Sequence, residues 1–170
     1  MKLVPIAQVR PEEVEALLDR AFGSDRHGRT AYRVRTGTAP IPELSLAALL
    51  DDRLAGTIQC WPVTLACDGG GARALVMVGP VAVEPEWQHE GIGSALMTAM
   101  LAAAEPSADP GADALMLIGD PEYYERFGFT AERTGGWRLP GPFEARRLLA
   151  RGPGVPAASG MLGPRVRVAA

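Results

Sequence analysis

Four residues with little apolar character follow a short apolar run in the middle of the chain. The apolar run ends at Val83, and after it come Gln88, Gly91, Gly93 and Ser94. The apolar residues that follow Ser94 recur with helical spacing. Val81 and Val83 are β-branched and fit an extended backbone. Pro85 interrupts the polar stretch between the two segments, so we expect a loop there. This order predicts a strand, a loop that contains glycines, and a helix from about Ser94.

A strand that enters a helix through glycines can bind an anion. The N–H groups in the first turn of a helix have no partner within the helix, and the peptide dipoles make that end partly positive. Phosphate groups bind there through backbone donors, and glycine lets them come close. The run is not a P-loop because no Gly-Lys-Ser/Thr follows, and Leu96 replaces the third glycine of a dinucleotide fingerprint. A tight structural turn without a ligand is the alternative.

A phenol in a second motif could take part in chemistry. Tyr124 lies in the run Asp120-Pro121-Glu122-Tyr123-Tyr124-Glu125-Arg126-Phe127-Gly128-Phe129. The spacing Gln88-x-x-Gly91-x-Gly93 resembles the acetyl-CoA pyrophosphate loop of the GNAT N-acetyltransferase superfamily, and Tyr124-x-x-x-Gly128-Phe129 resembles a second signature of that superfamily. With Val78-Gly79-Pro80 and Gly119-Asp120-Pro121 before the two motifs, the chain is most similar to the predicted-acetyltransferase branch typified by YhbS.

The resemblance implies a fold and a function. The implied fold is mixed α/β (α+β): a mostly antiparallel central sheet of six to seven strands, splayed at the central strand, with about four flanking helices. The implied function is transfer of an acetyl group from acetyl-CoA, as cosubstrate and without a metal, to a primary amine of a small molecule or peptide. An acyl-CoA-binding module of the same fold without transferase activity is the alternative.

The same resemblance assigns residues. Acetyl-CoA is expected to bind to Val81, Ala82, Val83, Gln88, His89, Glu90, Gly91, Ile92, Gly93 and Ser94. Backbone N–H groups at 81–83 could donate to the thioester carbonyl and to the oxyanion. Tyr124 is the expected catalytic residue, facing the leaving sulfur. Tyr123 could instead fill that role, or both rings could simply pack their helix.

The general base is not evident from the sequence. Glu43 and Glu84 lie near expected strand ends and are candidates, although both could be solvated carboxylates. Asp120 stands where many members of the superfamily have Asn, and we expect it to cap the following helix. The polar, basic region 24–42 is expected to help form the acceptor site, or to be a solvated loop or short helix.

The remaining elements follow from periodicity and from turn residues. We expect strands at 3–9, 44–50, 54–67, 74–83 and 114–118, a strand that begins at Phe129, and a last strand at 146–151. Helices are expected from Pro11 to Gly23 and from Pro121 to Gly128. Gly79-Pro80 inside the central strand predicts a bulge. The strands at 74–83 and 114–118 should be parallel, because a helix connects them.

Length and composition limit the class of protein. A chain of 170 residues with 47% hydrophobic and 22% charged residues fits one domain over 1–170, whose segment 152–170 the sequence does not place. A net charge of −3 argues against a nucleic-acid partner. No apolar run approaches a membrane span and no leader is seen at Met1, so we expect a cytoplasmic protein without a membrane partner. A homodimer is possible. Cys60 and Cys67 predict no disulfide framework.

Overall fold

The computed structural model describes residues 1–166, which form two compact units. The first unit contains residues 1–27, 40–60 and 79–107. The second contains residues 28–39, 61–78 and the described residues from 108 onward. Two long strands, β3 (Arg53–Cys67) and β4 (Ala72–Val83), each contribute residues to both units.

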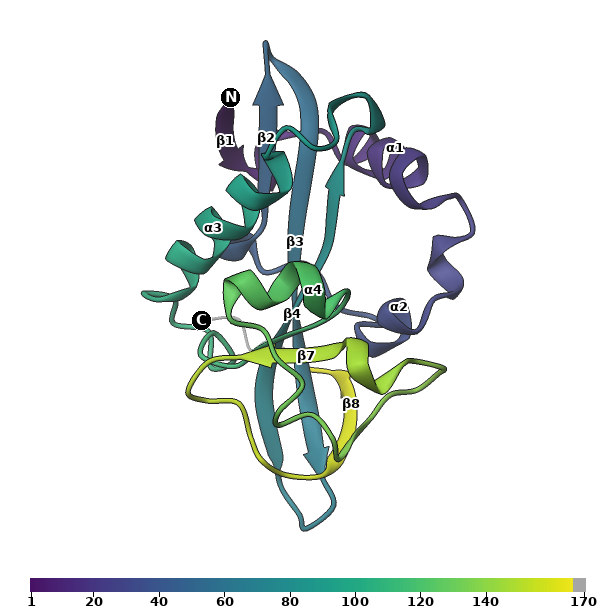
Figure 1. Cartoon of the computed structure of the whole chain (residues 1–170), viewed down its shortest axis with the longest axis vertical. Coiled ribbons are helices and arrows are strands. Elements are labelled where there is room, and N and C mark those ends of the chain that lie inside the picture. The colour runs from purple at the N-terminus through teal and green to yellow at the C-terminus, as the bar shows by residue number, and fades with distance from the viewer. Residues whose placement is uncertain (167–170) are drawn as a thin grey trace. The chain divides into compact units, whose positions relative to one another are not determined.

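Antiparallel pairs join the first strands of the first unit (Figure 1). β1 (Lys2–Pro5) pairs with β2 (Leu46–Leu50), and β2 pairs with residues 53–58 of β3. Asp51 and Asp52 join β2 to β3 with φ values of 48° and 62°, the left-handed pair that a two-residue hairpin turn needs. This turn joins as a hairpin two of the strands that the sequence predicted, those at 44–50 and 54–67.

The first two strands are shorter than the sequence predicted. The first was expected over 3–9, but Ile6–Gln8 is a 3₁₀ turn, closed by a hydrogen bond from the Val9 N–H to the Ile6 carbonyl. The second was expected from residue 44, but Pro42–Leu44 is also a 3₁₀ turn. Apolar residues in these turns reach the core without an extended backbone, so their hydrophobicity alone gave the wrong boundary.

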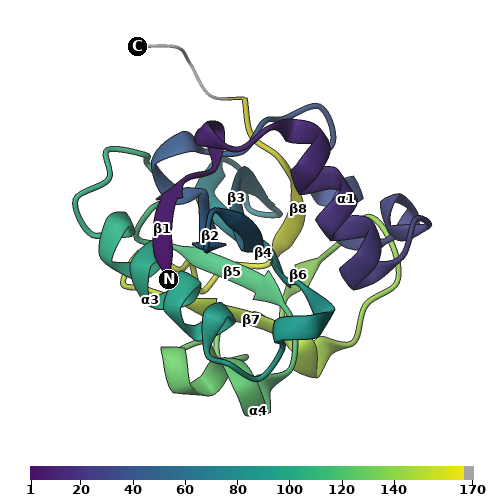
Figure 2. The same cartoon turned by 90° about the horizontal axis from the view of Figure 1, so that it is seen from above.

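Two helices cover opposite faces of this sheet. α1 (Pro11–Phe22) starts with Pro11 at its first position and ends at Gly23, whose φ is 93°, both as predicted. Its buried side chains pack in one cluster with Ala47 of β2. The next residue, Ala48, pairs with Gly56, which contacts α3 (Ile92–Ala104). Successive strand residues point to opposite faces, and Figure 2 shows α1 and α3 on different sides of β2.

Gly56 allows α3 to pack closely on β3. A Cβ atom there would lie 2.9 Å from the Ile92 Cγ2 atom and 2.9 Å from the Ala82 carbonyl oxygen. Both distances are too short for a side chain, so this position requires glycine. The start of α3 is thus held against the strand by contact with bare backbone.

The second unit contains most of the remaining strands. β5 (Leu115–Ile118) pairs in parallel with β4 at Val76 and Met77, as predicted, and antiparallel with β7 (Leu148–Arg151). Residues 63–67 of β3 pair with β8 (Gly160–Pro164), which also pairs with the short β6 (Trp137–Arg138). Two short helices, α2 (Thr30–Val34) and α4 (Pro121–Tyr124), belong to this unit.

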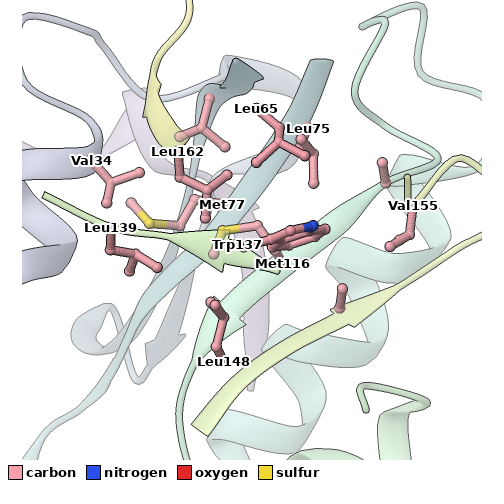
Figure 3. Packing of buried hydrophobic residues seen from close by; sticks show 13 residues of the cluster. Val34, Leu65, Leu75, Met77, Met116, Trp137, Leu139, Leu148, Val155 and Leu162 are labelled. Atoms are coloured by element: carbon pink, nitrogen blue, oxygen red, sulfur yellow. The ribbon is translucent and has the colours of Figure 1, made fainter. Parts of the chain in front are cut away.

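The core of the second unit surrounds Trp137. Figure 3 shows its indole amid aliphatic and methionine side chains from several strands and from α2. Trp137 is 2% exposed, and the labelled neighbours Met77 and Met116 are 3% and 0% exposed. Burial of these side chains is the main stabilising contribution of this unit.

Two predictions in the C-terminal half were wrong. Phe129 does not begin a strand: Thr130 makes only an isolated bridge to Ala150. Residues 146–151 are not the last strand, because β8 follows in the segment that the sequence did not place. A Cβ on Gly160 would collide with the Ala66 carbonyl, so β8 depends on a long-range fit that periodicity does not reveal.

The strand order β1-β2-β3-β4-β5-β7, with β8 beside β3, makes a mixed and mostly antiparallel sheet. The mixed α/β class predicted from the sequence is confirmed. Within residues 1–166, no helix is both long and apolar enough to span a membrane.

Candidate functional site

The end of β4 leads into the predicted loop. β4 ends at Val83, and the Glu84 N–H then donates to the Ala55 carbonyl at 2.8 Å, which ties the strand end to β3. The 3₁₀ turn Pro85–Trp87 follows, with the Trp87 N–H bonded to the Glu84 carbonyl. Ala82 is fully buried and packs with α1, whereas its two neighbours are half-buried. The expected strand and loop are both present.

Gly79 lies where the sequence predicted an irregularity in β4. Its φ is 126°, a backbone angle that residues with a side chain rarely adopt. A Cβ atom there would meet no atom within 4 Å. In the described register, β4 pairs with β5 at Val76 and Met77, both before this glycine. The backbone therefore departs from a regular strand at the predicted position.

The loop before α3 is exposed and has two residues in left-handed conformations. His89 has φ of 71°, and Gly91, the N-cap of α3, has φ of 83° and ψ of 7°. Gln88, Glu90 and Gly91 are exposed. A Cβ atom built on Gly91 would meet nothing within 4 Å. The space beside this glycine is therefore open, as the approach of a ligand to the backbone requires.

The helix begins two residues earlier than predicted. Ile92, at 3% exposed, packs over Gly56, and the Ala95 N–H bonds to the Gly91 carbonyl at 3.0 Å. Burial of Ile92 fixes the first turn, so Gly93 and Ser94 lie inside it. The first turn of this 13-residue helix then presents backbone N–H donors beside the open space at Gly91. This arrangement fits an anionic group the size of a phosphate.

Glu84, a candidate base, is already engaged. Its Oε2 accepts from Arg20 Nη2 at 2.7 Å, and its Oε1 accepts from Arg20 Nε at 3.0 Å. The Glu84 side chain is 14% exposed and that of Arg20 is 50% exposed. The hydrogen bond to Glu84 is the main reason that the pKa of Arg20 is raised. Both Glu84 oxygens are therefore held in a two-pronged ion pair.

A second ion pair steadies the turn before the loop. Arg53 Nη2 lies 3.0 Å from Glu86 Oε1, and the Arg53 guanidinium lies 4.8 Å from the centroid of the Trp87 ring. The sequence did not predict the ion pairs of Arg53 with Glu86 and of Arg20 with Glu84. No local pattern reveals them, because each links residues more than thirty positions apart.

Tyr124 belongs to the second unit, whereas the loop belongs to the first. Asp120 is the N-cap of α4 and Pro121 its first residue, as predicted, but the Asp120 side chain makes no capping hydrogen bond. Its carboxylate instead lies 3.6 Å from Arg147 Nε. The predicted capping role of this side chain is therefore wrong. Glu125–Phe127 continue as a 3₁₀ turn that ends at Gly128, with φ of 84°.

The Tyr124 ring is packed among aromatic groups. Its centroid lies 4.9 Å from that of Tyr123 and 6.3 Å from that of Phe129, both edge to face. A Cβ on Gly119 would overlap its ring, so this glycine makes room for the phenol. Burial, followed by the nearby Tyr123 and Asp120, raises the pKa of Tyr124 to about 12. The phenol therefore stays protonated at neutral pH and can donate a hydrogen bond.

The described residues give little support to metal binding or to a cysteine nucleophile. No group of three or more His, Cys, Asp or Glu side chains within residues 1–166 is arranged to hold a metal ion. Cys60 is completely buried, and this burial raises the pKa of its thiol and keeps it protonated. A thiolate nucleophile at this position is therefore not favoured.

Comparisons with known proteins identify the family. Residues 43–131 match the model of the acetyltransferase (GNAT) domain, and the chain belongs to this family. No curated protein matches the sequence. Among solved structures, the fold is similar to that of the GNAT N-acetyltransferase YhbS from Escherichia coli in complex with CoA, with a TM-score of 0.73. The two sequences are 21% identical, and the match covers 96% of this chain and 89% of that chain.

A second solved structure has the same fold. A GNAT family acetyltransferase from Brucella melitensis in complex with acetyl-CoA is 24% identical, covers 96% of this chain and 95% of that chain, and has a TM-score of 0.65. The predicted resemblance to GNAT proteins is therefore confirmed, as is the GNAT fold, and this fold is similar to that of YhbS.

Proposed function

We propose that this protein is an acetyl-CoA-dependent N-acetyltransferase that acts on a primary amine. The observation that carries the proposal is the junction between β4 and α3, where Gly91 leaves open space beside the first turn of a long helix. Membership of the GNAT domain family supports it. So do the two similar structures, which hold CoA and acetyl-CoA.

In this proposal the loop holds the pyrophosphate of acetyl-CoA. Backbone N–H groups of residues 88–94 donate to the phosphate oxygens, and the helix dipole adds favourable potential. Gly91 and Gly93 allow the phosphates to approach the backbone. The irregular strand at Gly79 would leave backbone groups at 81–83 available to the pantetheine arm and to the thioester carbonyl.

The reaction is a direct transfer. The neutral amine nitrogen attacks the thioester carbonyl carbon, the C–N bond forms, and the carbonyl electrons move to oxygen. When they return, the C–S bond breaks and CoA leaves as a thiolate. The amine gives up one proton to solvent or a base, and the thiolate gains one on release. The products are an N-acetyl amine and CoA, and positioning of the two reactants supplies much of the acceleration.

Tyr124 is proposed to stabilise the leaving thiolate by a hydrogen bond. Its pKa of about 12 exceeds the ~8.5 of a free thiol by about 3.5 units, so complete transfer of its proton to the sulfur is strongly uphill. A protonated phenol can still donate to developing negative charge on sulfur, where it lowers the barrier without losing its proton.

The proton of the amine is proposed to leave through water. Glu84 stands at the end of β4, but both of its oxygens accept hydrogen bonds from Arg20. This pair is also the observation that favours the second candidate function, an acyl-CoA-binding module without transfer. We further propose that the whole chain acts as one acetyltransferase domain, with a small-molecule or peptide amine as acceptor.

A screen of amines separates the two candidates. The protein is incubated with acetyl-CoA and a panel of small amines, amino acids and short peptides, and acetylated products are detected by mass spectrometry. We expect at least one product. We also expect Tyr124→Phe to slow its formation by about tenfold or more while the KM for acetyl-CoA stays unchanged. Tight binding of acetyl-CoA without any product would favour the binding module.

A further inference from the structure

A hollow in the second unit is lined by two arginines that the proposed function does not use. It has a volume of about 370 Å³ and lies at the edge of β7, where Thr130 bridges to Ala150. Arg133 and Arg151 both line it, with Thr130 and Gly128 beside them. None of its lining residues belongs to the loop at 88–94. We propose that this hollow binds a dianionic phosphoryl group, such as that of a phosphate monoester.

Backbone contacts hold the side chains of the two arginines that line the hollow. Arg151 Nη1 donates to the Phe127 carbonyl at 3.0 Å, and Arg133 Nη1 donates to the Val155 carbonyl at 3.4 Å. The stem of Arg151 passes over Gly128, since a Cβ there would lie 3.5 Å from the Arg151 Cδ atom. A ligand would therefore meet side chains that are already partly ordered, which reduces the entropy lost on binding.

The charge of the two arginines favours an anion. Within residues 1–166, neither Arg133 nor Arg151 lies within 4.0 Å of a carboxylate oxygen. Glu132 also lines the hollow, so the net charge of the lining is 2 − 1 = +1. Each guanidinium has five N–H donors, and the backbone bonds described above occupy one in each.

The arrangement fits a phosphoryl group better than a carboxylate. Guanidinium groups bind phosphate oxygens in pairs through charge-assisted hydrogen bonds. Arg133 and Arg151 come from separate segments of the lining, and their two positive charges balance a dianion. The Thr130 hydroxyl supplies a further donor. The volume leaves room for a small group attached to the phosphoryl.

Calorimetric titration of the full chain with phenyl phosphate tests the proposal. We expect saturable binding that Arg151→Met and Arg133→Met each weaken by about tenfold or more, since a hydrogen bond to a charged group is lost. Arg126→Met is the matched control: it removes a positive charge two residues before Gly128, from a side chain that stacks on Tyr123 and does not line the hollow. Melting temperatures show that the variants are folded.

Two further measurements decide between explanations. Binding should be stronger at pH 7.5 than at pH 5.5, because a phosphate monoester gains its second charge near pH ~6. Binding should also persist in saturating CoA. The proposal is overturned if all three variants bind phenyl phosphate equally, or if pH has no effect on this binding. It is also overturned if CoA displaces phenyl phosphate, and if Arg151→Met and Arg133→Met weaken the binding of CoA but not that of 3′-dephospho-CoA. The last result would assign the hollow to the cosubstrate's own phosphate.

Discussion

Gly91 and Gly37 offer a matched pair of positions that separates backbone strain from loss of a ligand. Gly91 has φ of 83° and Gly37 has φ of 77°, and a Cβ atom at either would meet no atom within 4 Å. The Cβ atom of a valine at either position therefore strains the backbone without meeting another atom. Gly91 stands at the proposed phosphate site, whereas Gly37 lies in a turn after α2, in the region 24–42 that is expected to help form the acceptor site and not to hold the phosphates.

The size of each effect follows from these facts. A left-handed backbone costs an L-residue ~1–2 kcal/mol, which lowers the melting temperature of a chain of this length by about 2–8 °C. Both Gly91→Val and Gly37→Val should show this loss. Gly91→Val also removes hydrogen bonds to the charged pyrophosphate, worth ~1.5–3 kcal/mol each. The loss of one such bond raises the Kd for acetyl-CoA by about 10- to 150-fold.

Calorimetric titration with acetyl-CoA and thermal unfolding measure the two effects on the same samples. We expect Gly37→Val to melt early and to bind normally, and Gly91→Val to melt equally early and to bind very weakly. Normal binding by Gly91→Val would refute the assignment of the phosphate loop. Equal loss of binding in both variants would show that backbone strain alone explains the effect.

Three further predictions concern stability and ionisation. Arg165→Leu removes the ion pair at 2.6 Å to the buried Asp109 carboxylate, which keeps the hydrogen bond from the Gly111 N–H, so the free energy of unfolding should fall by ~3–5 kcal/mol. Arg138→Leu, at an exposed pair, should change it by less than ~1 kcal/mol. Similar losses in urea unfolding would contradict this. Gly56→Ala should cost ~1–3 kcal/mol by pushing α3 off β3, and an unchanged melting temperature would count against that packing. Tyr124→Phe should remove an ionisation near pH 12 from the ultraviolet absorbance titration. Because the folded pKa is raised above ~10, the stability contribution of this phenol is complete below pH ~10 and is lost as the pH rises through about 12. Loss of an ionisation below pH 10 would contradict the burial of the ring.

Local chemistry made much of the fold predictable. Pro11 and Gly23 mark the ends of α1 because each has a backbone preference that suits its position. The parallel pairing of β4 and β5 followed from the helix between them. The loop around Gly91 could be located because glycine and a left-handed φ go together.

Long-range contacts explain the errors. β8 forms because Gly160 fits against the backbone of β3, which no periodicity within residues 152–170 indicates. The Asp120 carboxylate lies beside Arg147 instead of capping α4. In each case a partner far along the chain changes the role of a residue whose own neighbours suggested another.

Calorimetric titration of the unaltered protein with acetyl-CoA, with CoA alongside, is the direct test of the proposed cosubstrate site. Micromolar binding of about one molecule per chain is the result that the proposed site predicts. A folded sample that binds neither molecule would mean that the glycines at the start of α3 form only a tight turn, and the proposed transferase function would then be wrong.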